Sequence, residues 1–260
     1  RKVQPYLAVI FDGIKKVTFD EEAAAKGGDQ DLSITTMVAS EKVELLNKIY
    51  PCRGANIGAV ENWAAELRDQ MRLTVKDQWI RSMDAYPDSE RVDWAITWPQ
   101  MLVLNVSQLF WTREVEEALE TNTLPELCEA LQGQLDDIVK RVRGKLSKLQ
   151  KKIFMSLCIV DVHARNVVQD DLIGNQVHSR NDFEWLCQLR YYWEHCPDEP
   201  YNRYGTNPMN VLCRILNDTK PIMYGYEYLG NQGRLVVTPL TDRCYRTMMG
   251  AVALDYGGAP

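Results

Sequence analysis

The chain has 260 residues, of which 45% are hydrophobic and 25% charged, and its formal net charge is −6 at pH 7. This length suits one large or two modest domains with a sizeable buried core, and the composition is that of a globular protein. No run of about 18 apolar residues occurs, so no membrane span is predicted. The acidic balance argues against a general nucleic-acid binder.

Seven cysteines are scattered along the chain without a CxxC pair. An odd number with this spacing favours reduced thiols in a cytosolic protein over a disulfide framework or a zinc site. The start, Arg1-Lys-Val, lacks both an initiator Met and an apolar signal core. We therefore interpret it as an internal cut from a longer chain.

The first fifty residues mix apolar and acidic stretches. For the mostly apolar residues 3–19 we favour a helix that runs into a loop. The acidic, alanine-rich residues 20–31 indicate a surface connection. Residues 33–39 and 42–46 are expected to pair as a small hairpin.

Two helical segments are predicted next. Apolar residues recur at intervals of three and four from Val60 to Met83, which predicts a helix over residues 58–84 with one broad apolar face. Residues 94–120 form a second helical segment. Pro99 marks either its true start or a kink, because proline cannot donate a helix hydrogen bond.

The longest periodic stretch covers residues 124–175, and as one helix it would span about 75 Å. Gly133 and Gly144 weaken its interior, so a bend is expected at these glycines. Inside it, Lys140–Lys152 carries seven basic residues and no acid. This run is either a solvated helix face or a docking surface for an acidic partner.

Asp161 and His163 suggest a catalytic pair at first sight. Side chains two residues apart on a helix diverge by about 200°, so we do not expect them to form a dyad. The other histidines, His178 and His195, are isolated, and no metal-ligand spacing connects them.

The chain then becomes aromatic and proline-rich. Residues 179–193 predict another helix with an aromatic face. A proline-rich break covers residues 196–208, and we place a domain boundary there. Residues 210–216 and 222–228 are expected to form a hairpin joined by residues 217–221.

The C-terminal part predicts a short strand at Leu235–Val237, stopped by Thr238-Pro because proline offers no N–H to a sheet. A helix follows, with Thr241 or Asp242 as its N-cap. Gly257-Gly ends it, since glycine adopts a left-handed cap cheaply. Taken alone, this strand–turn–helix is an ordinary α/β connection.

The exact residues of this part resemble a known family. Tyr224-Gly-Tyr-Glu-Tyr-Leu-Gly, Arg234-Leu-Val-Val-Thr-Pro-Leu-Thr-Asp-Arg-Cys-Tyr and Gly257-Gly-Ala-Pro are similar to the entry to the first AAA+ module of dynein heavy chains. Other similar pieces follow the same order, among them Trp98-Pro-Gln, Arg143-Gly-Lys-Leu-Ser-Lys-Leu-Gln, Asp161-Val-His-Ala-Arg and Asp182-Phe-Glu-Trp-Leu-Cys-Gln-Leu-Arg-Tyr-Tyr-Trp. The sequence of these segments looks most like that of axonemal, inner-arm heavy chains.

The resemblance implies a mainly α fold, in which an elongated helical bundle with small β-hairpins precedes the first strand and helix of an α/β AAA+ domain. It assigns residues 1–196 to the C-terminal part of the helical linker and residues 197–221 to a connection. Residues 222–260 would be the N-terminal edge of the first AAA+ module. Residues 195–204 look like an insertion relative to the family.

By the same resemblance, six residues correspond to the segment that lies against the adenine ring of the first module's nucleotide: Leu235, Val236, Val237, Thr238, Pro239 and Leu240. Adenine would be recognised there by apolar contact and backbone hydrogen bonds. The sequence ends at Pro260, before the family's phosphate-binding glycine loop. The cofactor, ATP or ADP with Mg, is therefore expected to be held mostly by residues outside this segment.

The implied function is that of a segment of an ATP-driven microtubule motor of the cytoskeleton and the ciliary or flagellar axoneme, inactive by itself. The implied partners are the remaining AAA+ ring of the same heavy chain, microtubules through the distal stalk, and other dynein chains, with no nucleic acid and no membrane. One alternative is a non-motor helical scaffold with a small β appendage. Another is a self-contained nucleotide hydrolase, against which the lack of a glycine–lysine phosphate loop argues.

Overall fold

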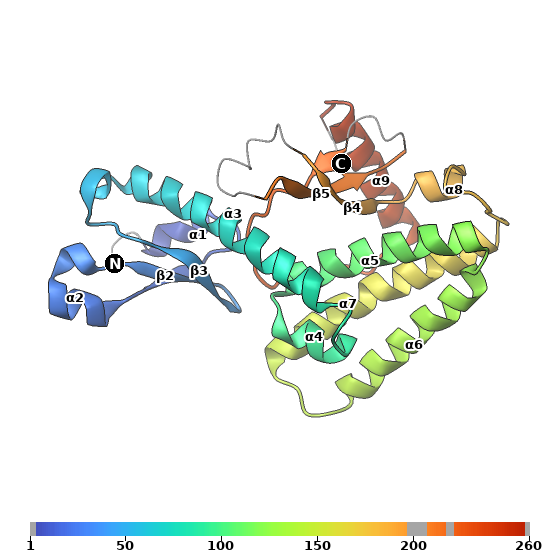
Figure 1. Ribbon diagram of the computed structural model, residues 1–260, viewed down its shortest axis with the longest axis horizontal. Coiled ribbons are helices and arrows are strands. Elements are labelled where there is room, and N and C mark those ends of the chain that lie inside the picture. The colour runs from blue at the N-terminus through green and yellow to red at the C-terminus, as the bar shows by residue number, and fades with distance from the viewer. Residues whose placement is uncertain (1–3, 197–206, 217–220, 258–260) are drawn as a thin grey trace.

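The computed structural model describes residues 4–196, 207–216 and 221–257. The molecule is mainly helical, and its elements gather in two groups at opposite ends (Figure 1). A small sheet with its short helices lies at one end, and a group of longer helices lies at the other. Helix α3 (Val60–Ala85) reaches from the first end to the second.

The N-terminal end is built on a three-stranded antiparallel sheet in the order β1-β2-β3. Its elements are η1 (Gln4–Tyr6), α1 (Leu7–Ile10), β1 (Lys16–Phe19), α2 (Glu21–Gly27), η2 (Asp29–Asp31), β2 (Ile34–Val38), β3 (Lys42–Ile49) and η3 (Gly54–Asn56). The predicted hairpin is confirmed, with Val38 opposite Lys42. For residues 3–19 we expected a helix that runs into a loop; α1 provides the helix, but the loop is wrong at Lys16–Phe19, where β1 pairs with β2 and buries Val17.

Helix α3 confirms the prediction over residues 58–84. It buries one stripe of large side chains: Trp63, Leu67, Met71, Val75 and Trp79. Helices α4 (Arg91–Thr97) and α5 (Gln100–Thr121) follow, and Pro99 separates them. The carbonyl of Pro99 accepts hydrogen bonds from Leu102 and Val103, so the proline marks a true helix start.

The long periodic stretch is two antiparallel helices and not one. Helix α6 (Leu124–Val142) ends at the expected break at Gly144, whereas Gly133 lies inside it without interruption. Helix α7 (Lys148–Asn166) starts at a capping box between Ser147 and Gln150 and continues into the π-helical segment η4 (Val167–Ile173). The apolar faces of α6 and α7 pack together. In a single helix of about 75 Å, these faces would stay exposed.

The helix predicted over residues 179–193 is wrong. Only α8 (Phe183–Leu186) is helical there, and strand β4 (Arg190–His195) follows it. Strand β4 pairs with β5 (Met209–Arg214), which pairs with β6 (Ile222–Met223) in the predicted hairpin. The predicted turn at residues 217–221 lies mostly outside the described residues. Trp193 of β4 lies against Trp79 of α3, with ring centroids 4.7 Å apart.

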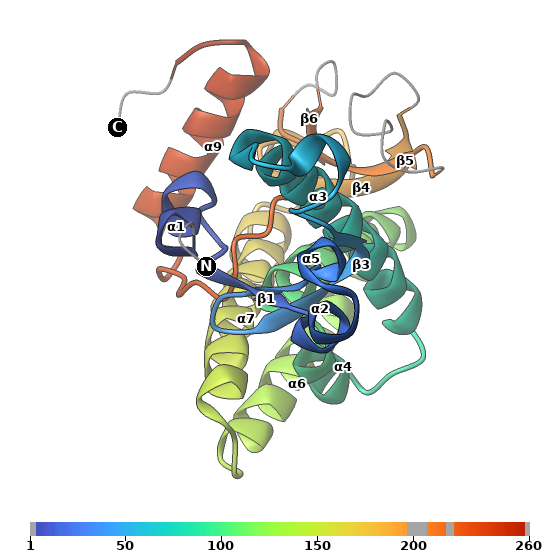
Figure 2. The same cartoon turned by 90° about the vertical axis from the view of Figure 1, so that its left-hand side faces the viewer.

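Helix α9 (Pro239–Ala253) stands at the outer edge of the molecule (Figure 2). The strand predicted at Leu235–Val237 is wrong, because these residues pair with no strand of the part of the chain that the structure describes. The predicted cap is also wrong, since Thr238 caps the helix in place of Thr241 or Asp242. The helix ends before the Gly257 predicted to stop it.

Candidate functional site at the start of helix α9

The start of α9 is fixed by a reciprocal capping box. The hydroxyl of Thr238 accepts from the backbone N–H of Thr241 at 3.3 Å, and the hydroxyl of Thr241 accepts from the N–H of Thr238 at 2.8 Å. Pro239 occupies the first helical position, where its missing N–H costs nothing. These three residues set the direction in which the preceding segment leaves the helix.

The six predicted adenine-side residues form a mostly exposed apolar ribbon. Leu235, Val236 and Leu240 are 75%, 66% and 72% exposed, and Val237 is half-buried. Large aliphatic side chains so exposed and so close together mark a surface that another group covers. Helix α9 continues this surface with exposed side chains at Tyr245, Met248 and Val252.

A cavity of about 630 Å³ lies between this region and the helical body. Leu235 and Val237 line it from the segment before α9, whereas the other four predicted residues do not. Helix α9 contributes Tyr245 and Met248, and α5 and α7 contribute Leu104 and Val160. The structure thus divides the predicted segment between a cavity wall and an outer surface.

The cavity wall also carries a buried charged pair. Arg91 donates to Asp161 through two hydrogen bonds of 2.7 and 2.8 Å. Asp161 thereby points away from His163, as predicted, and no Asp–His dyad forms. Glu114 lies near this pair, and burial raises the pKa of its carboxyl group despite the attraction of Arg91.

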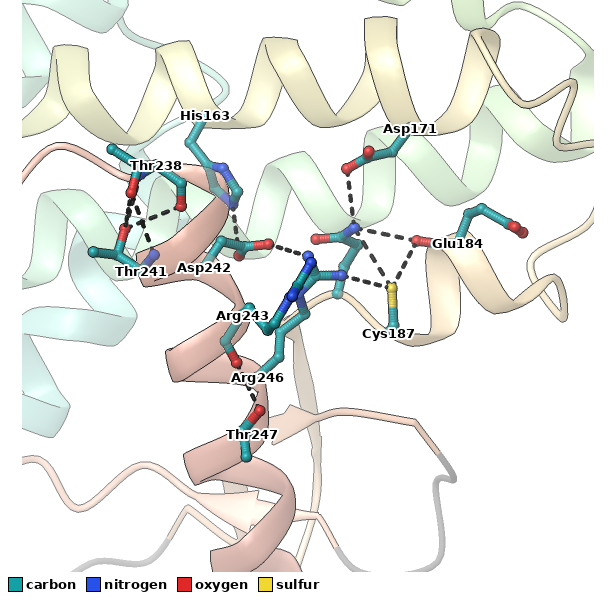
Figure 3. Close-up of polar contacts among 11 residues, drawn as sticks. His163, Asp171, Glu184, Cys187, Thr238, Thr241, Asp242, Arg243, Arg246 and Thr247 are labelled. Atoms are coloured by element: carbon teal, nitrogen blue, oxygen red, sulfur yellow. Dashed lines mark hydrogen bonds and ion pairs between the residues drawn. The ribbon is translucent and has the colours of Figure 1, made fainter. Parts of the chain in front are cut away.

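A polar cluster joins α9 to α7 and α8 (Figure 3). The Asp242 carboxylate forms an ion pair with Arg246 one turn later, and its Oδ1 lies 3.7 Å from Nε2 of His163 on α7. Arg246 also donates to Sγ of Cys187, just after α8, at 2.9 Å. Gln188 extends the cluster by donating to the Asp171 carboxylate of η4 at 3.4 Å.

Burial sets the protonation of this cluster. It lowers the pKa of the His163 imidazole, although the Asp242 and Asp171 carboxylates oppose that shift. It raises the pKa of the Cys187 thiol against the pull of Arg246, and it raises the pKa of Asp171. At neutral pH the imidazole and the thiol are therefore uncharged, and Arg246 is the cation that compensates Asp242.

The sequence alone does not reveal this cluster. The spacing of Asp242 and Arg246, four residues apart at the start of a helix, is a readable signal for their ion pair. His163, Cys187 and Gln188 come from distant parts of the chain, and their approach depends on how α9 docks.

The described residues contain no group of three or more His, Cys, Asp or Glu side chains arranged to hold a metal ion. None of the helices among these residues is long and apolar enough to cross a bilayer.

Comparison with known proteins places this region in a family context. A family model described as the hydrolytic ATP binding site of the dynein motor region matches residues 224–260. Mouse dynein axonemal heavy chain 12 is 44% identical over the whole chain, which covers 8% of that protein. Mouse dynein axonemal heavy chain 3 is 40% identical, and human dynein axonemal heavy chain 1 is 41% identical.

Residues 224–260, which include helix α9 and the segment before it, are thus similar to a dynein-type ATP-binding site. Over its whole length, the chain is homologous to a segment of axonemal dynein heavy chains. It spans less than a tenth of the length of these relatives, with 8%, 6% and 5% of each covered. This whole-length similarity favours a segment of a dynein heavy chain over the helical-scaffold alternative.

Proposed function

We propose that the chain is the C-terminal part of a dynein heavy-chain linker joined to the start of the first AAA+ module. Residues 1–196 would form the linker part, residues 197–221 the connection and residues 222–260 the edge of the module. The observation that carries this proposal is the match of residues 224–260 to a dynein ATP-binding site, on the capped helix α9 and its exposed apolar ribbon.

The parent protein would be an ATP-driven microtubule motor of the cytoskeleton and the ciliary or flagellar axoneme, of the inner-arm type. Its partners would be the remaining AAA+ ring of the same chain, microtubules through the distal stalk, and other dynein chains. The names of the matched relatives support the axonemal location. The segment alone would not hydrolyse ATP.

The helical body suits a force-transmitting lever. Helices α5, α6 and α7 pack through buried aliphatic side chains such as Leu135, Ile153 and Leu157, and α3 extends this body towards the N-terminal sheet. Tightly packed side chains resist deformation, so a displacement at one end is passed on and not absorbed. Strand β5 lies inside the proposed connection and pairs with β4 and β6, which supports a stiff link between the two parts.

The ribbon at residues 235–240 would contribute the adenine side of the nucleotide site. Its exposed aliphatic side chains offer apolar contact to a base, and the backbone of residues 235–237, which pairs with no strand of the described chain, offers hydrogen-bonding groups. The phosphates of ATP or ADP and the Mg ion would be held by residues outside this segment. The ribbon therefore supplies base contact and orientation, and no phosphate chemistry.

The test of this site is Pro239→Ala combined with Leu240→Ala in the full motor. We expect weaker binding of a fluorescent nucleotide at the first module, by about tenfold if one good apolar contact is lost. Leu254→Ala, at an exposed position just beyond the end of α9, is the matched control. Unchanged nucleotide affinity in the double variant would remove the ribbon from the site.

The lever is tested separately by Leu146→Asp, which places a carboxylate on a residue packed against the core where α6 turns into α7. We expect slower microtubule gliding at an unchanged basal rate of ATP turnover. Lys145→Asp introduces the same group at the exposed neighbouring position and serves as the control. Normal gliding by the Leu146 variant would contradict a lever role for this helix pair.

A further inference from the structure

The start of α9 has an unusual pattern of burial. Asp242 is the one residue of this helix in the described structure that is buried, at 8% exposure, while apolar residues of the same helix stay exposed. A carboxylate loses its hydration when it is buried and needs compensating partners. Helix α9 is thus attached at this end by a charged group and not by its apolar side chains.

The partners of Asp242 lie on two elements, and one of them reaches a third. Arg246 compensates the charge from the next turn of α9, and His163 approaches from α7 (Figure 3). Arg246 reaches further, to the Cys187 thiol beyond α8. That thiol in turn donates to the carbonyl of Glu184 at 3.4 Å, so one side chain of α9 is tied to the end of α8.

Apolar packing does not replace this attachment. Tyr245 and Met248 are 41% and 47% exposed, and both line the cavity that separates α9 from the helical body. A helix held across a cavity can change its orientation at a lower cost than a helix embedded in a close-packed core. The polar cluster therefore decides where α9 sits on α7.

The polar cluster and the ribbon share one helical turn. The backbone N–H of Asp242 donates to the carbonyl of Thr238 at 2.9 Å, and Thr238 lies within the ribbon. A displacement of the ribbon therefore moves the Asp242 carboxylate directly, without an intervening loop. The same displacement changes its distances to His163 and to the side chains around Cys187.

We propose that Asp242 and Arg246 are positioning residues that couple the adenine-side ribbon to helices α7 and α8 of the helical body. This inference rests on the proposed function, because it takes the ribbon as part of the nucleotide site. The cluster fixes the angle of α9 on α7, and a change at the base reaches α7 through Asp242. Coupling would thus begin within the first turn of α9.

The experiment uses the full motor with Asp242→Asn, which keeps the side-chain shape and removes the charge. We expect the ratio of gliding velocity to ATP turnover to fall at least about fivefold, the lower end of measured coupling between sites. Arg246→Gln should give the same loss, and Arg246→Lys, which keeps the charge, should restore part of it. Arg243→Gln, on an exposed neighbour on α9, should change nothing.

His163→Gln guards against a folding defect, because it removes the approach from α7 without leaving a charge unpaired. We expect His163→Gln to lower the ratio of gliding velocity to ATP turnover less than Asp242→Asn does. In the double variant, the fold-loss of this ratio should be smaller than the product of the fold-losses of the two single variants. A wild-type ratio in both single variants would overturn the inference. If Pro239→Ala with Leu240→Ala leaves nucleotide affinity unchanged, the proposed function fails instead, so the two failures are distinguishable.

Discussion

Arg91 on α4 and Asp161 on α7 form a two-bonded ion pair whose side chains are only 15% and 8% exposed. Burial disfavours the charged guanidinium, but the Asp161 carboxylate and the Tyr86 hydroxyl together outweigh it and raise the pKa of Arg91. Tyr86, at the end of α3, accepts a further hydrogen bond of 3.1 Å from the same guanidinium. One arginine thus ties three helices together beside the cavity.

Removing one partner of this pair should be costly. We expect Asp161→Ala to destabilise the chain by about 3 to 5 kcal/mol, because Arg91 would stay buried without compensation. Urea unfolding at pH 7 measures this change. Asp77→Ala, which breaks an exposed pair with Arg81 on α3, is the control and should cost less than about 1 kcal/mol.

Replacing both partners should cost less than removing one. Arg91→Met with Asp161→Leu fills the space without leaving a buried charge, so most of the stability should return. If the double variant were as unstable as Asp161→Ala, the attraction between Arg91 and Asp161 would stabilise the folded chain by more than the free energy that burying both charges costs. A loss below about 1 kcal/mol in Asp161→Ala would show that Arg91 finds water or another partner in the cavity.

Thr238 offers a test of the capping box at the start of α9. We expect Thr238→Ala to lower the stability of this helix by about 1 kcal/mol, because the N–H of Thr241 loses its acceptor. Hydrogen exchange of the first-turn amides of α9 reports this loss locally. Thr238→Ser keeps the hydroxyl and should exchange almost as slowly as the parent, whereas equal rates in the parent and Thr238→Ala would contradict the cap.

Glu114 provides a prediction for pH dependence. Burial raises the pKa of this carboxyl group in the folded chain. The folded state therefore binds the proton more tightly than the unfolded state, so stability falls as pH rises from about 4.5 through the raised pKa. Glu114→Gln should remove this fall, and its gain in stability over the parent should grow with pH across that window.

Thermal unfolding between pH 4 and pH 8 would measure the effect, with Glu129→Gln as the control, since Glu129 is exposed on helix α6. A gain of equal size at every pH would mean that the glutamine acts through packing and not through its lost charge. A variant less stable than the parent at pH 7 would show that Arg91 and Arg113 attract the Glu114 carboxylate more than burial penalises it.

Local sequence signals predicted the element boundaries that neighbouring residues in the chain determine. Pro99 separates α4 from α5 and Gly144 follows the end of α6, and both breaks were predictable. The helix–helix turn at Gly144 also needs α6 and α7 to bury each other's apolar faces, which periodicity alone does not reveal. Strand β4 has an aromatic composition compatible with helix or strand, and its partner β5 decides the outcome from residues 209–214.

The candidate site likewise combines features that the sequence predicts with features that only the folded chain shows. The resemblance to dynein heavy chains pointed to residues 235–240, which lie within the matched residues 224–260, and their role beside a nucleotide stays a prediction. The strand predicted at residues 235–237 needs a partner strand, and the described chain provides none beside it. The contacts of Asp242 with His163 join residues about 80 positions apart, so only the folded chain shows them.

The last prediction concerns Gly13, where the N-terminal end meets the segment that leads to the ribbon. A Cβ atom at this position would lie 1.9 Å from the carbonyl oxygen of Tyr228 and 2.7 Å from Cα of Leu229. Both are backbone atoms, so the strain cannot be relieved by a side-chain rotation. We expect Gly13→Ala to destabilise the chain by about 1 to 3 kcal/mol, as overpacking does.

Gly133 is the matched control, because it lies inside helix α6 and a Cβ atom added there would meet open space. There alanine has a higher helix propensity than glycine, so Gly133→Ala should stabilise the chain by about 0.5 to 1 kcal/mol. Differential scanning calorimetry would therefore show opposite shifts in Tm for the two substitutions. If Gly13→Ala also raised Tm, the close approach of Gly13 to the Tyr228–Leu229 backbone would be contradicted, and the N-terminal end would not brace the segment before the ribbon.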